Sequence, residues 1–501
     1  MEDDDGENGL VEQLQHDAQE ATRWIVAVSV VNFDLTVGPV IECVYPSDAL
    51  SMELQNSISN MVLPDSNVSE LGDSIFTIRV SSLLIYGVVC FRQIADSSTE
   101  RGFFQKSLVI LSYLPFIPLW KSVVSVLAPI YFQHGSTSVF EAAARNWSVW
   151  PDPKTLSGNE HLPFLGQVFS VDVPLSMIWE GDNIIGTFTY LPLHDIFYSS
   201  LRHLWSLWEI VITGRPLLII SDTPTTASNI VLALVSLLPP SFAYLADYRP
   251  YFTLTDPDYP HYLTMCNYGR LSGCIIGATN QFFLESLEKF PNILRLDSDI
   301  PTLKVSHHLS TRADEAFIRS LQESADKNSA LRTYFQALTC SVLLPFDPYF
   351  KPAPYVARTA LVSPIFNPYL DQIRLAEFSL QVFLKGLFIS KEKTQHIRPV
   401  IRKKSRIISF YKSLIQGPNF LPWFDSLRRT ILQDLDGRTD AAILAVDIAE
   451  VMDGLRLPEV HAMIKEIKRR KKCPRSISRP ALMKALERHY TTVDSVLVKM
   501  S

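Results

Sequence analysis

The sequence predicts a mixed α/β protein with an N-terminal α/β lobe, a central α/β lobe whose sheet is largely parallel, and an all-helical C-terminal part. Three observations predict this class. Strand-like runs dominate from Arg23 to about residue 112, strands alternate with helical patterns between His194 and Phe290, and helical patterns alone follow Thr311. Strands that alternate with helices are typical of parallel pairing, because each return to the same edge of a sheet needs a crossover.

A chain of 501 residues is too long for one hydrophobic core, so about two to four domains are expected. Val149–Glu160 is rich in Pro, Gly and polar residues, which is typical of a linker. The predicted divisions are a disordered acidic leader at 1–22, the N-terminal lobe at 23–148, a linker at 149–163, the central lobe at 164–310, a helical part at 311–435 and a helical extension at 436–501.

The N-terminal lobe is predicted to contain strands, one helix, three further strands and a closing helix. TRWIVAVSVVNFD and GPVIECVYP supply the first strands, and Ser51–Val62 follows with helical spacing. Ser74–Val80, Leu83–Gln93 and Gly102–Ser112 are the next strands, and Phe116–Phe132 is the closing helix.

Three short apolar runs bounded by Gly, Pro or Asp are the candidate strands of the central lobe. They are Leu217–Ile220, Tyr251–Leu254 and Cys274–Gly277. Thr223, followed by Pro224, predicts the start of one helix, and Asn280 is expected to cap another. Phe164–Val173 is expected to add a strand to the same sheet, Asn292–Leu296 to be its last strand, and Ser298–Leu309 to be a loop.

The C-terminal part shows helical periodicity throughout, and it contains no evident internal repeat. The predicted helices are Ala313–Leu344, Pro368–Ile389, Lys404–Ile415, Phe420–Asp434, Thr439–Leu455, Pro458–Arg470 and Pro480–Lys499.

Composition narrows the classes of function. Hydrophobic residues make up 47% of the chain, which is typical of a folded protein, and the net charge of −6 argues against a nucleic-acid partner.

The acidic start, MEDDDGENG, is unlike a secretory signal. The most apolar segment, Ser107–Phe132, is interrupted by Lys121 and three prolines, so a membrane span is not expected. Six scattered cysteines without a CxxC pair indicate free thiols, and we expect a soluble cytoplasmic protein.

Sequence motifs for bond-making chemistry are missing. The chain has no GxxxxGK[ST], GxGxxG, HExxH or GxSxG motif, and the adjacent His307 and His308 lack a third metal ligand. We therefore expect no cofactor and no metal. A catalytic site assembled only in space is not excluded by this absence.

Four strings of the sequence resemble one family. SLWEIVITGRPLLII, DYRPYFTLTDP and CIIGATNQFF resemble, in this order, the central module of DENN-domain proteins, and are most similar to the subfamily called DENN domain-containing protein 6. RGFFQKSLVILSYLP resembles that subfamily's N-terminal lobe, a longin-like module with the order of strands and helices predicted above. The resemblance covers about residues 24–435. This sequence departs from it by being compact between Phe76 and Tyr86, and by carrying Gln281 where relatives often have Pro.

The resemblance implies a guanine-nucleotide exchange factor that binds a GDP-bound or nucleotide-free Rab GTPase across the two N-terminal lobes. The implied contact residues are Lys106, Asp247, Tyr248, Arg249, Thr279, Asn280 and Phe282. Each has a structural alternative. Asp247 and Arg249 could pair to hold a strand entry, Asn280 could be an ordinary helix cap, and Trp205 and Trp208 are expected to be core residues rather than a partner hot spot.

Two further functions remain open, together with a membrane contact. The chain could only tether an active GTPase, or it could be a GTPase-activating protein that uses Arg101 as an arginine finger. Five basic residues could attract an anionic membrane, although a solvated helix end is the default: Lys468, Arg469, Arg470, Lys471 and Lys472. Recruitment to endosomal or other vesicle membranes is the localisation that these features suggest.

Overall fold

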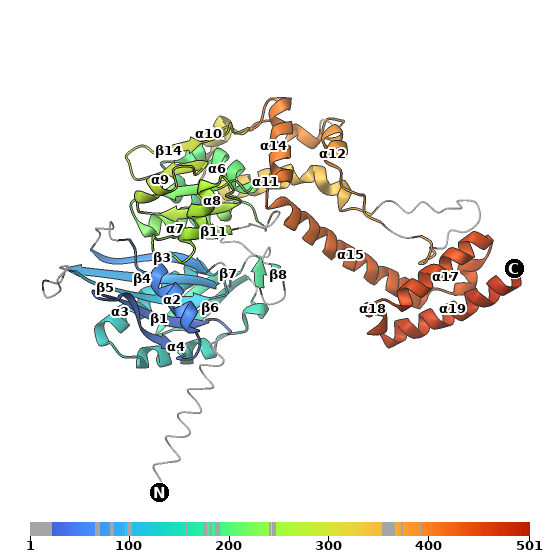
Figure 1. Ribbon diagram of the computed structural model, residues 1–501, viewed down its shortest axis with the longest axis horizontal. Helices are drawn as coiled ribbons and strands as arrows, with labels where there is room; N and C mark the ends of the chain where they lie inside the picture. Colours follow the sequence, from blue (N-terminus) through green and yellow to red (C-terminus); the bar gives the residue numbers. More distant parts are fainter. Residues whose placement is uncertain are drawn as a thin grey trace, which may run out of the picture. The chain divides into compact units, whose positions relative to one another are not determined.

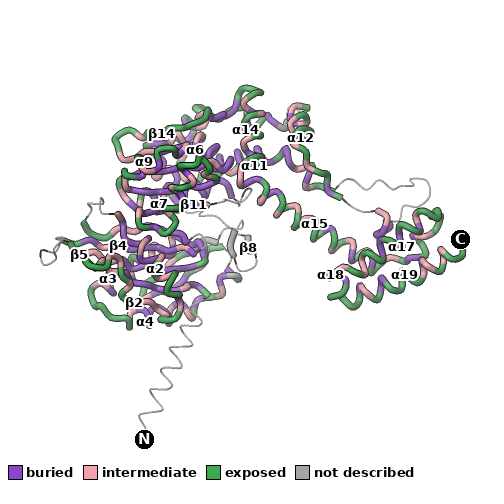
Figure 2. Tube along the Cα trace, in the orientation of Figure 1, coloured by how far each residue is buried: buried purple, intermediate pink, exposed green. Residues whose placement is uncertain are grey.

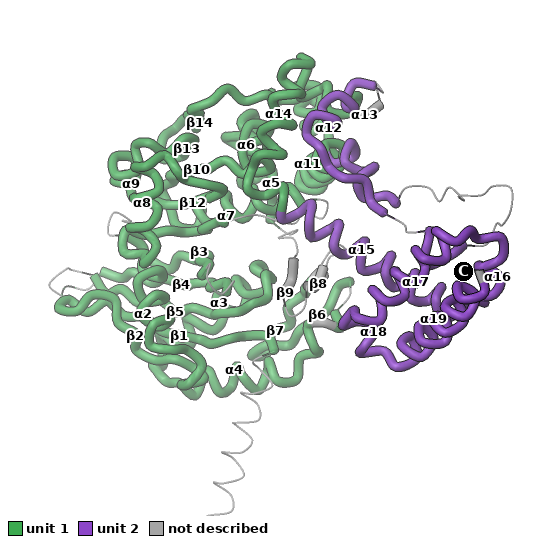
Figure 3. The backbone as a smooth tube through the Cα atoms, turned by 45° about the vertical axis from the view of Figure 1, so that its right-hand side comes forward, with its two compact units in different colours: residues 1–342, 394–421 green, residues 343–393, 422–501 purple. Residues whose placement is uncertain are grey.

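The structure is a computed structural model that divides into two compact units, residues 1–342 with 394–421, and residues 343–393 with 422–501 (Figure 3). We call them unit 1 and unit 2. The residues described are 23–65, 71–80, 85–95, 97, 103–156, 158–173, 178–180, 183–185, 191–239, 242, 247–352, 366–371, 374–389 and 392–500. The acidic leader at 1–22 lies outside them.

The first module of unit 1 is a five-stranded antiparallel sheet in the order β2-β1-β5-β4-β3. Its strands are β1 (Ala27–Asp34), β2 (Gly38–Tyr45), β3 (Gly72–Val80), β4 (Ile85–Ala95) and β5 (Phe103–Ser112). Side chains alternate between its faces. One face packs on α2 (Met52–Met61) through Ile58 and Phe76, and the other packs on α3 (Ile117–His134), so that both faces are covered (Figure 1).

A hairpin that we expected to join the central sheet is instead attached to this first module. β6 (Gly158–Phe164) and β7 (Gln167–Val173) form their own two-stranded sheet, which contacts α3 and α4 (Ser138–Ser148). Phe164 is fully buried and its ring stacks on Trp147, with centroids 5.4 Å apart. The predicted placement of Phe164–Val173 in the central sheet is therefore wrong. A second small hairpin, β8 (Ile178–Glu180) with β9 (Asn183–Ile185), follows.

The second module of unit 1 is a sheet in the order β11-β12-β10-β13-β14. Its strands are β10 (Leu217–Ile220), β11 (Asp247–Arg249), β12 (Cys274–Ala278), β13 (Asn292–Arg295) and β14 (Thr302–Val305). The first four strands in this order pair in parallel, and only β14 is antiparallel, which confirms the largely parallel sheet. Figure 2 shows buried residues concentrated in the two five-stranded sheets of unit 1.

Two expectations for this sheet are wrong. The strand expected at Tyr251–Leu254 lies earlier, at β11, because Pro250 has no N–H to continue the ladder. The segment expected as a loop, Ser298–Leu309, contains β14, which extends the edge of the sheet by pairing with β13.

Helices lie on both faces of this sheet. They are α5 (Leu193–Phe197), α6 (Leu204–Ile212), α7 (Pro224–Val235), α8 (Tyr259–Asn267) and α9 (Phe282–Ser286), with a 3₁₀ turn at Leu201–His203. Of these, α7 and α9 lie where the sequence predicts them. Thr223 caps α7 by accepting a hydrogen bond from the N–H of Thr226 (3.1 Å). Trp205 and Trp208 on α6 are fully buried, which confirms them as core residues.

Gly277 explains how closely α7 approaches the sheet. A Cβ atom at this position would lie 2.4 Å from the carbonyl oxygen of Pro250 and 3.0 Å from that of Ala227. Only a glycine allows these backbone segments to meet.

The rest of unit 1 is helical. It includes α10 (Glu315–Glu323), α11 (Lys327–Leu343) and α14 (Lys404–Gln416), and α13 (Glu392–Gln395) lies at the unit boundary. The single helix expected at Ala313–Leu344 is two helices, because the chain becomes extended at Ser324.

Unit 2 is helical among its described residues. It contains a 3₁₀ segment (Leu344–Tyr349), α12 (Leu380–Gly386), most of α15 (Phe420–Ala445), α16 (Ile448–Met452), α17 (Leu457–Lys471), α18 (Pro474–Ile477) and α19 (Pro480–Met500). The break expected between Asp434 and Thr439 is wrong, since α15 runs through it. No helix among the described residues is long and apolar enough to cross a membrane. The N-terminal sheet, central sheet and helical C-terminal part together confirm the predicted fold class.

Candidate functional site

The two modules of unit 1 meet at the carboxyl ends of the central parallel strands. Thr225, at the start of α7, donates to the carbonyl of Ile75 on β3 (2.9 Å). Thr253 and Thr255, which follow β11, both donate to the carbonyl of Asn60 at the end of α2 (2.9 and 2.8 Å). Open α/β sheets usually bind small ligands at this edge. Here the first module lies against it, and we call this contact the module junction.

A cluster of charged and aromatic side chains joins β3 and β4 to β11 within the module junction. The Arg79 guanidinium lies 4.2 Å from the centre of the Tyr248 ring, and its Nη1 is 3.4 Å from both Asp247 Oδ1 and the Tyr248 carbonyl. The hydroxyls of Tyr86 and Tyr248 are 2.6 Å apart. Burial raises the pKa of the Tyr248 phenol, so that it stays protonated and available for this hydrogen bond.

Arg249, the last residue of β11 in the second module, belongs to the same cluster. It pairs with Asp258 at the start of α8 (Nη2–Oδ2 2.5 Å) and lies 3.5 Å from Asp247. The side chain of Asp247 also accepts a hydrogen bond from the hydroxyl of Tyr262 on α8. The predicted Asp247–Arg249 pair is therefore confirmed.

The exposure predicted for these residues is wrong. Tyr248 and Arg249 are only 6% and 5% exposed. The reason is that they belong to β11 itself, which contacts β3 and α7 and whose Arg249 side chain lies against Tyr262 of α8, and not to the loop before a strand. Asp247 is intermediate in exposure but is held by Arg79, Arg249 and Tyr262.

A second group of polar residues lies beside the carboxyl end of β12. The hydroxyl of Tyr251 is 3.0 Å from Thr279 Oγ1 and accepts a hydrogen bond from the N–H of Asp65 (3.4 Å). The Asp65 carboxylate in turn accepts from the N–H of Leu254 (3.3 Å). Thr279 is 3% exposed, so its predicted position on an accessible rim is also wrong.

Asp65 should make the stability of unit 1 depend on pH. Burial raises the pKa of its carboxyl to about 6, although hydrogen bonds from Leu254 and Asn280 oppose the shift. The folded protein therefore binds this proton more tightly than the unfolded chain does. Preferential protonation of Asp65 in the folded state therefore stabilises unit 1 fully below pH ~4. This stabilisation is lost as the pH rises through ~6.

We expect Asp65→Asn to raise the free energy of unfolding at pH 7 by on the order of 2 kcal/mol, with the gain disappearing near pH 4. Denaturant titrations at both pH values would measure this. Asp34→Asn is the matched control, because hydrogen bonds from the N–H groups of Val37 and Thr36 lower the pKa of exposed Asp34. This variant should show no gain at pH 7. An equal gain for Asp65→Asn at both pH values would contradict the account.

Exposed and half-buried groups border the module junction on one side. The Asn280 side chain accepts a hydrogen bond from the N–H of Phe282 (3.0 Å), but the N-cap position of α9 is Gln281, one residue later than expected. Phe282 is 50% exposed, whereas its neighbour Phe283 is fully buried, as expected. Asn280 interacts with Asp65, and Thr255 is bonded to Asn60, so these groups are contiguous across the two modules. We call Asn60, Thr255, Asn280 and Phe282 the junction rim.

Lys106 does not belong to the junction rim. It lies on β5, on the face of the first sheet that α3 covers, and forms an ion pair with Glu42 (2.6 Å). Tyr131 on α3 donates to the same carboxylate (2.8 Å). The α2 face, which meets the second module, is the opposite face of this sheet. The structure therefore separates Lys106 from the other predicted contact residues.

The predicted basic cluster lies on α17 in unit 2, and part of it is structural. The side chain of Arg470 is 12% exposed and bonds to Glu466 (3.0 Å) and to the buried Asp440 of α15 (3.5 Å). Arg475 and Arg479 also pair with Asp440 (2.9 and 3.5 Å). Asp440 therefore joins α15 to α17 through Arg470 and to α18 through Arg475.

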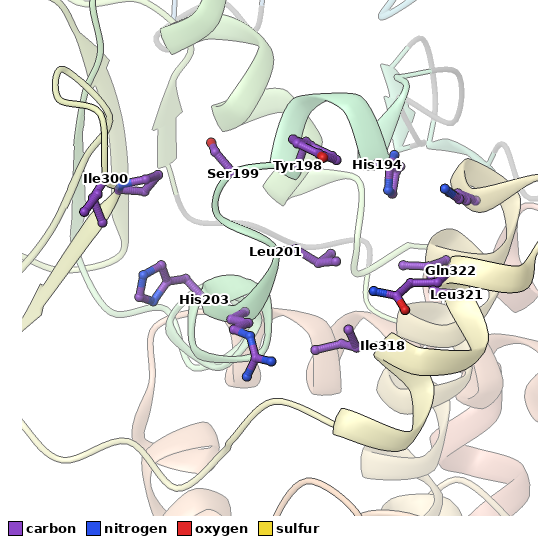
Figure 4. A pocket seen from close by; sticks show the side chains of 12 residues that line it. His194, Tyr198, Ser199, Leu201, His203, Ile300, Ile318, Leu321 and Gln322 are labelled. Atoms are coloured by element: carbon purple, nitrogen blue, oxygen red, sulfur yellow. The ribbon is translucent and has the colours of Figure 1, made fainter.

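A surface pocket of about 630 Å³ lies elsewhere on unit 1, between the segment from α5 to α6 and helix α10 (Figure 4). Its walls include His194, Tyr198, Arg202, Ile300 and Lys327. None of the predicted contact residues lines it. Sequence analysis missed this pocket because its walls come from three separated segments.

Sequence analysis also missed the side chains that join the modules. Arg79 stands in the largely apolar strand segment IFTIRV, and a charge at such a position is a signal for a buried partner. Its partner on β11 is 168 residues away in the chain, so no local pattern could identify it. The alternative catalytic residue Arg101 lies outside the described residues.

Known proteins are similar to this chain over nearly all of this architecture. Protein DENND6A of Mus musculus is 30% identical over 526 residues, which cover 89% of this chain and 82% of that protein. Protein DENND6 homolog of Dictyostelium discoideum is 29% identical, covering 89% of this chain and 76% of that protein. Protein DENND6B of Homo sapiens is 26% identical, covering 95% and 91%.

A family model described as "Transport protein Avl9" matches residues 25–249, which include the first module and the second as far as the end of β11. The architecture, a sheet-rich N-terminal module joined to a largely parallel central module and followed by helices, is that of a DENN-type protein. With a relative 30% identical over most of its length, the chain belongs to the DENND6 family. The resemblance found in the sequence is confirmed.

Proposed function

We propose that this protein is a guanine-nucleotide exchange factor that promotes GDP release from a Rab-family GTPase. The observation that carries the proposal is membership of the DENND6 family over 89% of the chain, a span that takes in both modules and the junction rim. DENN-domain proteins of this kind act on Rab GTPases. The proposed partner is therefore a Rab protein in its GDP-bound or nucleotide-free state.

The chemistry that this activity needs is binding, because an exchange factor makes and breaks no bond in the nucleotide. It must bind the nucleotide-free GTPase more tightly than the loaded form, since only differential affinity shifts the equilibrium. In GTPases the switch segments are ordered by phosphate and Mg²⁺. A surface that holds these segments in another arrangement weakens both contacts, and GDP leaves.

The module junction suits such a surface because contacts within this protein hold the two modules together in the absence of the partner. Arg79, Tyr86 and Tyr248 join the two modules through partly buried polar contacts, and Lys121 on α3 donates to Asn229 on α7 (2.5 Å). Burial lowers the pKa of Lys121 to about 8. A preformed surface loses little conformational entropy on binding, which favours affinity. The junction rim supplies hydrogen-bonding groups and one half-exposed aromatic ring, Phe282, as its anchor.

The binding preference for nucleotide states tests the proposal against its alternatives. Immobilised Rab proteins would be prepared nucleotide-free, GDP-loaded and loaded with a non-hydrolysable GTP analogue, and binding of the full chain would be measured. We expect the tightest binding to the nucleotide-free form of one or two Rab proteins. Preference for the GTP analogue would contradict exchange and favour a tether or a GTPase-activating protein. The proposed location is the cytoplasm, with peripheral recruitment to endosomal or other vesicle membranes.

A further inference from the structure

The exposed face of α17 in unit 2 carries a row of basic residues. His461, Lys465, Lys468 and Lys472 follow one another at intervals of four, three and four residues, and all four are exposed. These intervals place them in one row on a helix. Between residues 456 and 479 the chain has nine Lys and Arg against two Glu, so the segment is strongly basic.

The two carboxylates of α17 do not neutralise this row. Glu459 bonds back to the start of the helix at Arg456 (2.9 Å), and Glu466 is occupied by Arg469 (2.6 Å) and Arg470 (3.0 Å). No carboxylate lies within ion-pair distance of Lys465, Lys468 or Lys472 among the described residues, whereas Lys471 approaches Glu487 (4.0 Å). Of the five basic residues predicted from sequence, the structure thus leaves Lys468 and Lys472 on the outward row and adds Lys465.

The opposite face of α17 is fixed in the core of unit 2. Val460, Met463, Ile464 and Ile467 pack with residues of α16 and α19 in one hydrophobic cluster. The helix cannot roll to hide its lysines or to insert an apolar face elsewhere. Like charges at these intervals repel one another, so the row lowers helix stability unless an anionic surface lies against it. The helix dipole accounts for cations in the last turn but not for Lys465, which precedes it.

We propose that the row of Lys465, Lys468 and Lys472 is a docking surface for a lipid bilayer that carries anionic headgroups. A bilayer fits this row because the charges of the row are separate lysine ammonium groups. Such groups attract a charged surface, but they lack the bidentate geometry with which arginine binds one phosphate or carboxylate. The outward row itself contains no aromatic residue on which nucleic-acid bases could stack, and the neighbouring ring of Tyr490 on α19 has the ammonium groups of Lys468 and Lys471 against it (5.4 and 5.5 Å from its centre). This surface would bring the exchange activity proposed above to a membrane, but it does not depend on that activity.

Vesicle flotation with the full chain, in the absence of any GTPase, tests the proposal. We expect binding to vesicles of phosphatidylcholine with phosphatidylserine, no binding to phosphatidylcholine alone, and loss of binding as salt rises. The variant Lys465→Gln/Lys468→Gln/Lys472→Gln should bind about a hundredfold more weakly. The control Lys304→Gln/Lys403→Gln/Lys412→Gln removes the same charge from exposed lysines of unit 1 and should bind normally.

Three results would overturn the proposal: equal binding to both kinds of vesicle, equal losses in the two triple variants, or stronger binding to a soluble polyanion such as heparin than to the vesicles. The α17 variant should unfold at the same denaturant concentration as the wild type or a higher one, which separates lost binding from lost folding. GDP release in solution without vesicles should be unchanged in this variant. Failure of membrane docking and failure of the exchange proposal are thereby distinguishable.

Discussion

Replacing Arg249 by alanine is expected to lower the free energy of unfolding of unit 1 by about 3 kcal/mol. The guanidinium is buried and pairs with Asp258 and Asp247. Its positive charge also favours the ionised form of the nearby Asp256 carboxyl. Burial raises the pKa of Asp256 to about 6, and Arg249 is one of the groups that oppose this shift. Removing the cation leaves three carboxyl groups without their shared partner.

The matched control for this variant is Arg202→Ala. Arg202 pairs with Glu315 at the same distance, 2.5 Å, but its side chain is 70% exposed, so its loss should change stability by less than about 1 kcal/mol. Denaturant unfolding followed by tryptophan fluorescence would compare the two, because all tryptophans except Trp423 lie in unit 1. Equal effects of the two substitutions would contradict the structural role given to Arg249.

Phe282→Ala is expected to slow the GDP release that this protein stimulates from its Rab partner by about tenfold to thirtyfold, without changing the stability of unit 1. A half-exposed aromatic ring beside capped and bonded polar groups is the type of residue that anchors an interface. Because its neighbour Phe283 fills the core, truncation of Phe282 alone removes contact area without opening a cavity. The measurement is the exchange rate as a function of the concentration of the protein.

Tyr268→Ala is the control for Phe282. Tyr268 is also a highly exposed aromatic residue of the second module, but it follows α8 and precedes β12, at the opposite edge of the central sheet from the junction rim. Its loss should leave exchange unchanged. If both variants lose activity equally, or neither does, the junction rim is not the binding surface.

Local sequence patterns were sufficient for much of the fold. β10 and β12 lie where short apolar runs bounded by turn residues predict them, and α7 begins at Thr223-Pro224. These elements are specified by neighbours in the chain: a cap, a proline, a glycine or a run of β-branched residues. The largely parallel pairing also follows from their alternation with helices.

The bounds of β11 and the burial of the predicted contact residues depend on contacts between distant segments, which local sequence patterns do not show. DYRPYFT contains a strand, but which three residues pair with β12 depends on Pro250 and on the partner strand. The burial of Tyr248 and Thr279 comes from the docking of the first module, whose contributing residues Arg79 and Asp65 lie far away in the chain. The sequence alone suggests Arg249 and Thr279 as contact residues whose substitution would test binding. Because both are buried, their substitution is expected to report on stability instead. Phe282 is the residue in this region whose change we expect to report on a partner.

The most direct test of the central claim is the release of fluorescent GDP from a panel of purified Rab proteins, with and without the full chain. The account predicts strong acceleration for one or two members, reduced by Phe282→Ala and retained by Tyr268→Ala. If no Rab protein responds, while the chain binds a GTP-loaded Rab, the exchange function is contradicted, and the result favours a tether or a GTPase-activating protein.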